Sequence, residues 1–442
     1  MQLTRRGWME LGGATGAAGM AGITGAAALL AGCAPQGTPQ AAGDRVLVST
    51  PRGLLAVDPS KGMRRVTPAG AIAGPDWTRL YSAVVTGDKT RLTTLDAKTG
   101  AQLAAVDVDG RLAARIASRD GIWLALTEVE PGRRLAETSW QPVGRERTTM
   151  VIADPTGARP ARRLELAGNY EPDAFSTNAS QVFVLEYMPP LNPDRYRVRQ
   201  INLKTGVPGP LLTRFKRAAV VAEEEMQGQG RMQVLAPDAR TLLTLYTKQD
   251  DHLHMHTRDY VQAGGSGRPD PMVHAFVHTL SLSEGWAYCL DLPMPFGVGP
   301  AWAHAMATSR DGTRLFIADR SSGTIAVADT QTLELRGRYA VEMDALSVPG
   351  EAALDVGPDG RLYVASGASV LVFGSAALAD SGAPQMRWPL AGTVCGLKLS
   401  QDGKRLYAGQ ADRVVILSTA DGREIGRIDV GDVQTISYVG RA

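Results

Sequence analysis

The chain has 442 residues and a formal net charge of +2 at pH 7, from 47 lysine and arginine residues against 45 aspartate and glutamate residues. So balanced a charge argues against a broad nucleic-acid-binding surface, which would need a basic domain or stripe, and against a disordered, self-repelling chain. Three cysteines are too few for a disulfide scaffold. Glycine (49 residues) and proline (26 residues) together make up about 17% of the chain. This fraction exceeds the roughly 12% usual for globular proteins and indicates many turns.

The first 33 residues have the pattern of an export and lipidation signal. Arg5 and Arg6 precede an uncharged stretch, residues 11–32. The stretch runs into the four residues Leu30, Ala31, Gly32 and Cys33. This segment resembles a twin-arginine export signal that ends in a lipobox, which implies that Cys33 is lipidated and becomes the new N-terminus. The alternative is an uncleaved N-terminal anchor, because 22 uncharged residues can span a membrane.

The signal predicts where the mature protein is found and how it is divided. Residues 1–32 form the signal peptide, residues 33–43 a flexible tether without core-forming side chains, and residues 44–442 one folded domain. The mature protein is then extracytoplasmic and attached to the cell membrane by the lipid on Cys33.

From residue 44 onward the sequence repeats one short unit. Its clearest copy is residues 309–318, in which the Asp-Gly pair 311–312 lies between a polar residue pair and an apolar run. Asp-Gly supplies the positive φ angles of a tight hairpin turn, and the flanking apolar runs predict strands. The turn markers, spaced 43 to 73 residues apart, are Asp76, Asp120, Asn178, Asp238, Asp311, Asp359 and Asp402.

A second turn recurs further along several units and joins a third predicted strand to a fourth. Its copies are residues 58–62, 96–100, 202–206 and 419–422. Four antiparallel strands at a period of about 45 residues are typical of a β-propeller blade. We therefore predict an all-β fold, a β-propeller of four-stranded blades, with eight blades counted and seven as the alternative.

The eighth unit is divided between the two ends of the chain. Residues 433–439 have the character of a first strand, and residues 45–50 and 53–58 that of a second and a third. Pairing the C-terminal strand with the N-terminal ones would close the ring and remove an exposed edge.

The units around Asp311, Asp359 and Asp402 resemble the YVTN-type and WD40-like propeller repeats of bacterial envelope and surface proteins. The resemblance is good over residues 300–430 and weak over residues 110–290. It implies the fold more firmly than a function, since propellers host binding modules and enzymes alike.

All six histidines lie between residues 252 and 304. In an extended segment His252, His254 and His256 would share one face and could bind a transition metal through their imidazoles. The alternative is a solvent-exposed loop, because glycine- and serine-rich sequence follows at residues 263–269. We expect no other cofactor.

Two further features have a structural and a functional interpretation. The insertion at residues 128–147 carries four arginines and Trp140, and it is a candidate recognition rim or an ordinary long loop. Cys289 and Cys395 fall in different predicted blades, so we expect two buried thiols rather than a disulfide.

The sequence contains no nucleophile elbow and no phosphate-binding loop. The leading hypothesis is therefore a binding or scaffolding module for an unknown envelope protein or small molecule. The alternatives are a hydrolase, such as a lactonase-like propeller with a site at the central channel, and an envelope metal-binding protein that uses the histidine-rich insertion.

Overall fold

The computed structural model describes residues 43–59, 63–67, 70–129, 144–214, 225–226, 230–247, 273–344, 352–374 and 382–441. Within these ranges nearly all regular structure is β-strand, and the one helix is a single 3₁₀ turn, Ala301–Ala303. No helix among the described residues is long and apolar enough to cross a membrane.

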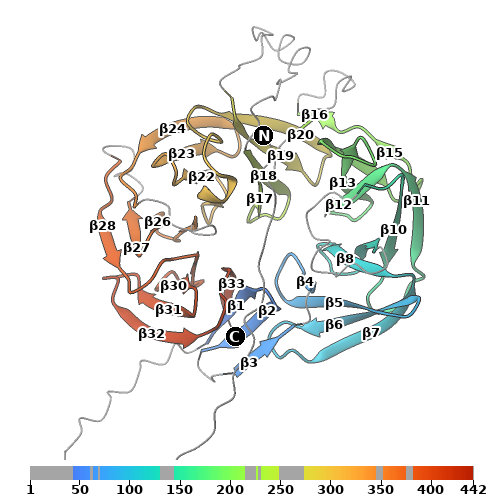
Figure 1. Cartoon of the computed structure of the whole chain (residues 1–442), viewed down its shortest axis with the longest axis horizontal. Helices are drawn as coiled ribbons and strands as arrows, with labels where there is room; N and C mark the ends of the chain where they lie inside the picture. The colour runs from blue at the N-terminus through green and yellow to red at the C-terminus, as the bar shows by residue number, and fades with distance from the viewer. Residues whose placement is uncertain are drawn as a thin grey trace, which may run out of the picture. The chain divides into compact units, whose positions relative to one another are not determined.

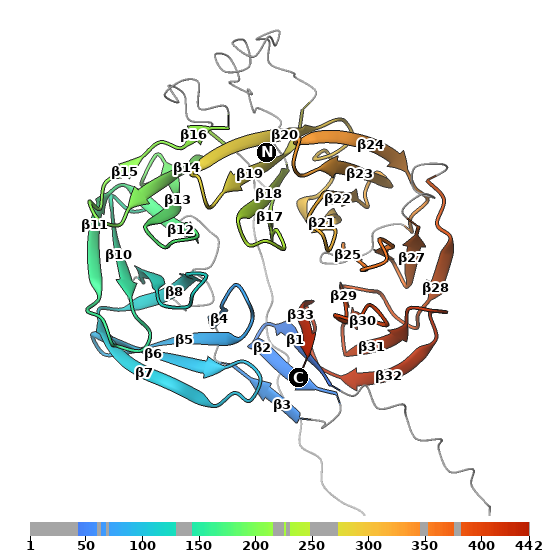
Figure 2. The ribbon, with the colours of Figure 1, turned by 180° about the vertical axis from the view of Figure 1, so that it is seen from behind.

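Eight sheets follow one another around a ring, which we number as blades 1 to 8 (Figures 1 and 2). The strands of each blade are given from the axis of the ring outward. Blade 1 consists of β33 (Thr435–Arg441), β1 (Asp44–Thr50), β2 (Gly53–Asp58) and β3 (Met63–Val66). Blade 2 consists of β4 (Ile72–Ala73), β5 (Arg79–Thr86), β6 (Lys89–Asp96) and β7 (Gln102–Asp109). Blade 3 consists of β8 (Leu112–Ala117), β9 (Leu124–Glu128), β10 (Arg147–Ala153) and β11 (Arg162–Ala167).

The next two blades continue the same order. Blade 4 consists of β12 (Asn169–Phe175), β13 (Gln181–Met188), β14 (Arg195–Asn202) and β15 (Pro208–Gly209). Blade 5 consists of β17 (Gly230–Leu235), β18 (Thr241–Thr247), β19 (Ala275–Ser281) and β20 (Trp286–Leu292), with β16 (Leu212–Thr213) added outside β20. This fifth strand pairs in parallel and was not predicted, because two residues between blades carry no strand pattern.

The last three blades come from the part of the chain with the clearest repeats. Blade 6 consists of β21 (His304–Thr308), β22 (Arg314–Asp319), β23 (Thr324–Asp329) and β24 (Glu334–Ala340). Blade 7 consists of β25 (Leu354–Val356), β26 (Leu362–Ser366), β27 (Ser369–Phe373) and β28 (Met386–Pro389). Blade 8 consists of β29 (Gly396–Leu399), β30 (Arg405–Gln410), β31 (Arg413–Ser418) and β32 (Glu424–Asp429). The fold is a β-propeller of eight blades, as the repeat predicts, and not of seven.

The ring closes by pairing the two ends of the folded domain. β33 runs antiparallel to β1, with Asp44 opposite Arg441 and Ser49 opposite Thr435. The C-terminal strand therefore supplies the inner strand of blade 1, as predicted, although it begins at Thr435 rather than at residue 433. The pairing satisfies backbone groups on both strands that would otherwise form open edges.

The seven predicted turn markers all lie between the first and second strands of blades 2 to 8. The residue after each marker has a positive φ, for example 73° at Gly312. In three turns this position holds a residue other than glycine: Trp77 (58°), Ala179 (52°) and Ala239 (53°). These three copies look weak in the sequence because they keep the turn geometry without the residue that favours it.

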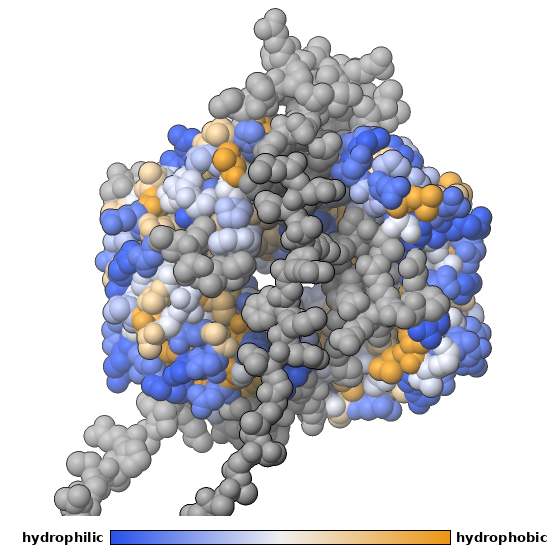
Figure 3. Space-filling view, in the orientation of Figure 1, coloured by the Kyte–Doolittle hydropathy of each residue, from blue (hydrophilic) through white to orange (hydrophobic). Residues whose placement is uncertain are grey.

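The core lies between neighbouring blades. Strands in the middle of the blades are almost wholly buried, as in β19 and β27, because another blade covers each face of the sheet. One such cluster joins Phe316 and Ile325 of blade 6 to Val364 and Leu371 of blade 7. On the face shown in Figure 3, hydrophilic residues predominate around the ring and apolar residues form small separate patches.

The two cysteines of the folded domain form no disulfide, as predicted. Cys289 is buried in β20 of blade 5. Cys395, next to β29 of blade 8, is half-buried rather than buried, and its thiol lies 3.4 Å from the carbonyl oxygen of Val433. The expectation of two buried thiols is therefore wrong for Cys395, because it precedes its strand and lies near the inner edge of the ring.

Candidate binding site in the channel

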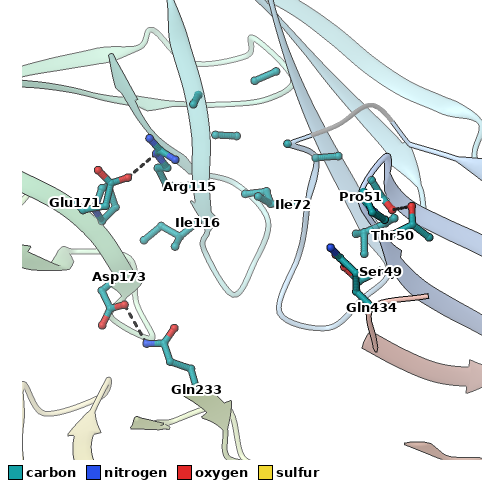
Figure 4. Close-up of a pocket in the computed structure, with 18 residues that line it drawn as sticks. Ser49, Thr50, Pro51, Ile72, Arg115, Ile116, Glu171, Asp173, Gln233 and Gln434 are labelled. Carbon is teal, nitrogen blue, oxygen red and sulfur yellow. Dashed lines mark hydrogen bonds and ion pairs between the residues drawn. The ribbon is translucent and has the colours of Figure 1, made fainter. Parts of the chain in front are cut away.

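A cavity of about 620 Å³ lies where the inner parts of blades 1 to 5 face the axis of the ring (Figure 4). Much of its wall is made of small residues, glycine and alanine, with Leu54 and Ile72. The polar side chains that line it are Ser49, Thr50, Arg115, Glu171, Asp173, Gln233 and Gln434. A volume of this size is typical of sites for small molecules.

Two charged residues of this wall sit at β-bulges in inner strands. The pairing of β8 with β9 skips Arg115, and the pairing of β12 with β13 skips Asp173. A bulge inserts one unpaired residue and redirects its side chain, and bulges are frequent next to functional sites. Pro172, beside the second bulge, is tolerated because β12 is the edge strand of its blade.

Glu171 lies between two arginines. Its Oε1 is 2.5 Å from Nε of Arg115, and its Oε2 accepts a hydrogen bond of 2.8 Å from Nη2 of Arg145. Nε of Arg115 also donates to the hydroxyl of Thr127 at 2.7 Å. All three charged side chains are largely buried, with 10% of Arg115, 14% of Glu171 and 19% of Arg145 exposed. Each oxygen of the Glu171 carboxylate therefore faces its own guanidinium group.

Arg145 is held by groups of blade 4 as well. Its Nε donates to Oδ1 of Asn169 at 3.0 Å, and its Nη2 donates to the carbonyl oxygen of Tyr170 at 2.6 Å. Arg145 belongs to the insertion that we treated as a candidate recognition rim. The structure places this arginine beside Glu171 of the cavity wall, while residues 130–143 of the insertion lie outside the described residues.

Asp173 forms a second charged group, with blade 5. It accepts hydrogen bonds from Nη2 of Arg231 and, at 3.0 Å, from Nε2 of Gln233. Burial alone would lower the pKa of Arg231, but the Asp173 carboxylate outweighs burial and the pKa is raised overall. Nε of Arg231 lies 3.4 Å from the hydroxyl of Tyr246, whose pKa burial raises to about 12. Arg231 and Tyr246 therefore both stay protonated at neutral pH.

The residues predicted from the sequence to carry function lie elsewhere. The export and lipidation residues Arg5, Arg6, Leu30, Ala31, Gly32 and Cys33 are outside the described residues, and so are His252, His254 and His256. In the part of the chain that the structure describes, no group of three or more histidine, cysteine, aspartate or glutamate side chains is arranged to hold a metal ion.

The other histidines belong to blades 5 and 6. His278 in β19 and His304 in β21 are both buried, with 5% and 1% exposed. The backbone N–H of Gly297 donates to Nε2 of His304 at 3.1 Å, and Nδ1 of the same ring lies 3.2 Å from the carbonyl oxygen of Pro300. His304 therefore connects the chain segment before β21 to that strand.

Sequence reasoning missed the residues of the cavity wall. A signal was present: charged residues interrupt the apolar first strands of blades 3 and 4, at Arg115 in one and at Glu171 and Asp173 in the other. An apolar strand that holds a charge at its centre needs a partner for that charge. Nothing in the sequence identifies the partner, because Arg145 lies in the segment before β10 and Arg231 lies in β17 of another blade.

The site and the ring define a class: an eight-bladed β-propeller with a charged cavity in its channel. No protein-family model matches the sequence, and no curated protein matches it. Among solved structures it is similar to the dihydro-heme d1 dehydrogenase NirN in complex with DHE, at 14% identity over 90% of this chain and 74% of that one, with a TM-score of 0.50. It is also similar to apo AztD from Citrobacter koseri, at 9% identity over 90% of this chain and 98% of that one, with a TM-score of 0.52. At such identities the likeness concerns the fold alone.

Proposed function

We propose that the mature protein is a lipid-anchored, extracytoplasmic β-propeller that binds a small molecule in the channel cavity. The observation that carries this proposal is the wall of the cavity, where bulged strands present Arg115 and Asp173 beside Glu171 and Gln233. Largely buried charged groups beside a cavity, held by their own hydrogen bonds, are the arrangement that a preorganised binding site requires.

A binding role is favoured over a hydrolytic one by the partners of the two carboxylates. A general acid or base must gain or lose a proton within hydrogen-bond reach of the substrate. Both oxygens of Glu171 face arginines, and Asp173 accepts from Arg231 and Gln233. These contacts fit a role for Glu171 and Asp173 in holding the cavity wall in place rather than in transferring protons. The lactonase-like alternative is therefore second to a binding module.

The binding experiment uses the neutral fluorescent dye N-phenyl-1-naphthylamine on the purified domain, residues 34–442. We expect saturable binding at one site, weakened at least tenfold by Ala71→Trp, which places a large ring at the cavity. Ala71 is half-buried at this site. The control Ala420→Trp, in an exposed turn of blade 8, should leave the affinity within twofold. Dye binding that is equal in the two variants would refute the channel as the site.

The lipid anchor is tested separately in cells. The full-length protein should incorporate a labelled fatty acid, and Cys33→Ala should abolish the label. Cys395→Ala is the matched control, since this thiol lies in the folded domain. Replacing Arg5 and Arg6 together by lysine should hold the protein in the cytoplasm. Persistent labelling of the Cys33→Ala variant would contradict the assignment.

The metal-binding alternative rests on His252, His254 and His256. Metal analysis of the purified domain separates it from the binding module. Bound copper, zinc or nickel that disappears when all three histidines are replaced by alanine would support it, and no bound or titratable metal would remove it.

A further inference from the structure

The three charged side chains that line the cavity are Arg115, Glu171 and Asp173, and each contacts a group of opposite charge. Glu171 contacts Arg115 through one carboxylate oxygen and Arg145 through the other. Asp173 contacts Arg231 of blade 5. Because each of these charges is already paired within the protein, the choice of ligand depends on the hydrogen-bonding groups that the wall leaves open.

Gln233 presents such a group, a hydrogen-bond acceptor. Its Nε2 donates to Oδ1 of Asp173 at 3.0 Å and lies 3.3 Å from the hydroxyl oxygen of Thr244. A carboxylate only accepts hydrogen bonds, so this contact fixes the amide with its nitrogen toward Asp173 and its oxygen on the other side. Oε1 of Gln233 accepts no hydrogen bond from the described residues, and it points toward the cavity (Figure 4).

The rest of the wall is mainly apolar. Leu54, Ile72 and Ile116 line it together with alanines of blades 2 and 3. The polar side chains of blade 1 that line the opposite side, such as Ser49 and Gln434, carry no charge (Figure 4). The cavity therefore combines an apolar surface with an acceptor on the side of blades 4 and 5.

A charged group fits poorly beside Gln233. A carboxylate or sulfonate carries acceptors alone, and it would face Oε1 of Gln233 and the carboxylate of Asp173. An ammonium group could donate to both, but the guanidinium of Arg231 is already bonded to Asp173 and would repel it. A hydroxyl group donates a hydrogen bond without bringing a charge.

We propose, on the basis of the binding function above, that the ligand is an uncharged amphipathic molecule, a hydroxyl group on an apolar body. The hydroxyl group donates to Oε1 of Gln233. The apolar body lies against Ile72, Ile116 and the alanines of blades 2 and 3.

The test measures how naphthalenes with different substituents displace bound N-phenyl-1-naphthylamine from the purified domain at pH 7. 2-Naphthol carries the hydroxyl group, and 2-methoxynaphthalene has a methyl group in place of the hydroxyl hydrogen. We expect 2-naphthol to bind about fivefold more tightly, because the methyl ether cannot donate a hydrogen bond. Apolar burial alone would favour the methyl ether, so the order of the two affinities identifies the hydrogen bond.

Two charged naphthalenes test whether the ligand is uncharged. 2-Naphthoate carries a negative charge and 2-naphthylmethylammonium a positive one. Both should bind more weakly than 2-naphthol. Tighter binding of either one would overturn the assignment of an uncharged ligand.

The variant Gln233→Met locates the hydrogen bond, because methionine has a similar length and no amide. It should weaken 2-naphthol about fivefold and leave 2-methoxynaphthalene within twofold. The matched control is Gln200→Met in β14, a half-buried glutamine that does not line the cavity and whose Nε2 donates to the carbonyl oxygen of Pro210 at 2.7 Å. It should keep the preference for 2-naphthol. The comparison of ligands on the unmodified domain does not depend on how well either variant folds.

The outcomes separate this inference from the proposed function. If Ala71→Trp blocks the dye but 2-naphthol and its methyl ether bind the unmodified domain equally, the cavity binds ligands and the hydroxyl preference is wrong. A preference that persists in a folded Gln233→Met variant also contradicts the inference. If Ala71→Trp leaves dye binding unchanged, the binding function itself fails.

Discussion

The hydroxyl of Tyr407 donates a hydrogen bond of 2.7 Å to Oδ2 of Asp44, a residue 363 positions earlier in the chain. Nε of Arg405 donates to the same oxygen at 2.8 Å. Asp44 begins β1 of blade 1, and the other two residues lie in β30 of blade 8, so the contact crosses the junction at which the ring closes. Burial and the Asp44 carboxylate raise the pKa of Tyr407, which keeps its hydroxyl a donor.

This contact predicts a stability effect of Asp44→Asn. Only 4% of the Asp44 side chain is exposed, so loss of its charge leaves Arg405 with a weaker acceptor in a largely dry setting. We expect the free energy of unfolding, measured by urea denaturation, to fall by about 1.5–3 kcal/mol. The control is Asp432→Asn, whose exposed partner Arg52 lies 3.9 Å away. That change should cost less than about 0.5 kcal/mol, and equal effects would argue against a closing role for Asp44.

The cavity wall predicts a second stability effect. Glu171→Gln keeps the shape of the side chain but leaves Arg115 and Arg145 without the carboxylate that they share. We expect a loss of about 3 kcal/mol in the free energy of unfolding, since removing the acidic partner from buried ion pairs is costly. Glu424→Gln removes a partner of Arg427 on the exposed strand β32 and should change stability by less than about 0.5 kcal/mol. A loss below 1 kcal/mol for Glu171→Gln would contradict this account of the wall.

The hairpin turns predict that replacing alanine by glycine in one turn and glycine by alanine in an equivalent turn have opposite effects on stability. Ala239 has a φ of 53°, which strains a residue with a Cβ atom, whereas Gly312 has a φ of 73° in the corresponding turn. Ala239→Gly should raise the free energy of unfolding by up to about 1 kcal/mol, and Gly312→Ala should lower it by about 1 kcal/mol. A Cβ atom at Gly312 would lie 3.4 Å from the nearest atom, so the loss reports backbone strain rather than a clash. Thermal unfolding of the two variants gives the signs, and effects of the same sign would contradict the explanation.

The contacts of Glu186 predict part of the loss of folding stability of the propeller at acid pH. Burial alone would raise the pKa of this carboxyl group, but hydrogen bonds from Arg197 at 2.7 Å and Tyr170 at 3.0 Å outweigh burial, and the pKa is lowered. A lowered pKa in the folded state contributes stability above the unfolded value of about 4.3, and this contribution disappears as the pH falls through the folded value.

The measurement follows unfolding free energy between pH 6 and pH 3. The unmodified domain should lose stability below about pH 4.3, and Glu186→Gln should be less stable at pH 6 with a shallower decline. Glu334→Gln, at an exposed residue 3.6 Å from Arg336, should keep the slope of the unmodified domain. An unchanged slope for Glu186→Gln would show that other carboxylates dominate acid unfolding.

The sequence by itself determines the architecture, because its signals are local. Asp-Gly pairs such as 311–312 specify turns through backbone geometry, and the flanking apolar runs specify strands. The seven turns therefore give seven blades, and the strands divided between the two ends of the chain give the eighth. Ring closure also follows from the sequence, since residues 433–439 have the pattern of a first strand with no later strands to pair with. The weaker turns at Trp77, Ala179 and Ala239 were still found, because the Asp or Asn before each one was kept.

The tertiary structure alone decides the site. Arg115 and Asp173 read as isolated charges in apolar strands, and the strand pattern cannot show that each sits at a bulge facing the channel. Their partners come from other strands: Glu171 from the next blade, and Arg231 from the one after. A cavity forms where the edges of several sheets meet, and its charge depends on distances across blades. The local sequence pattern of a strand carries no information about those distances, whereas a turn depends almost entirely on its own few residues.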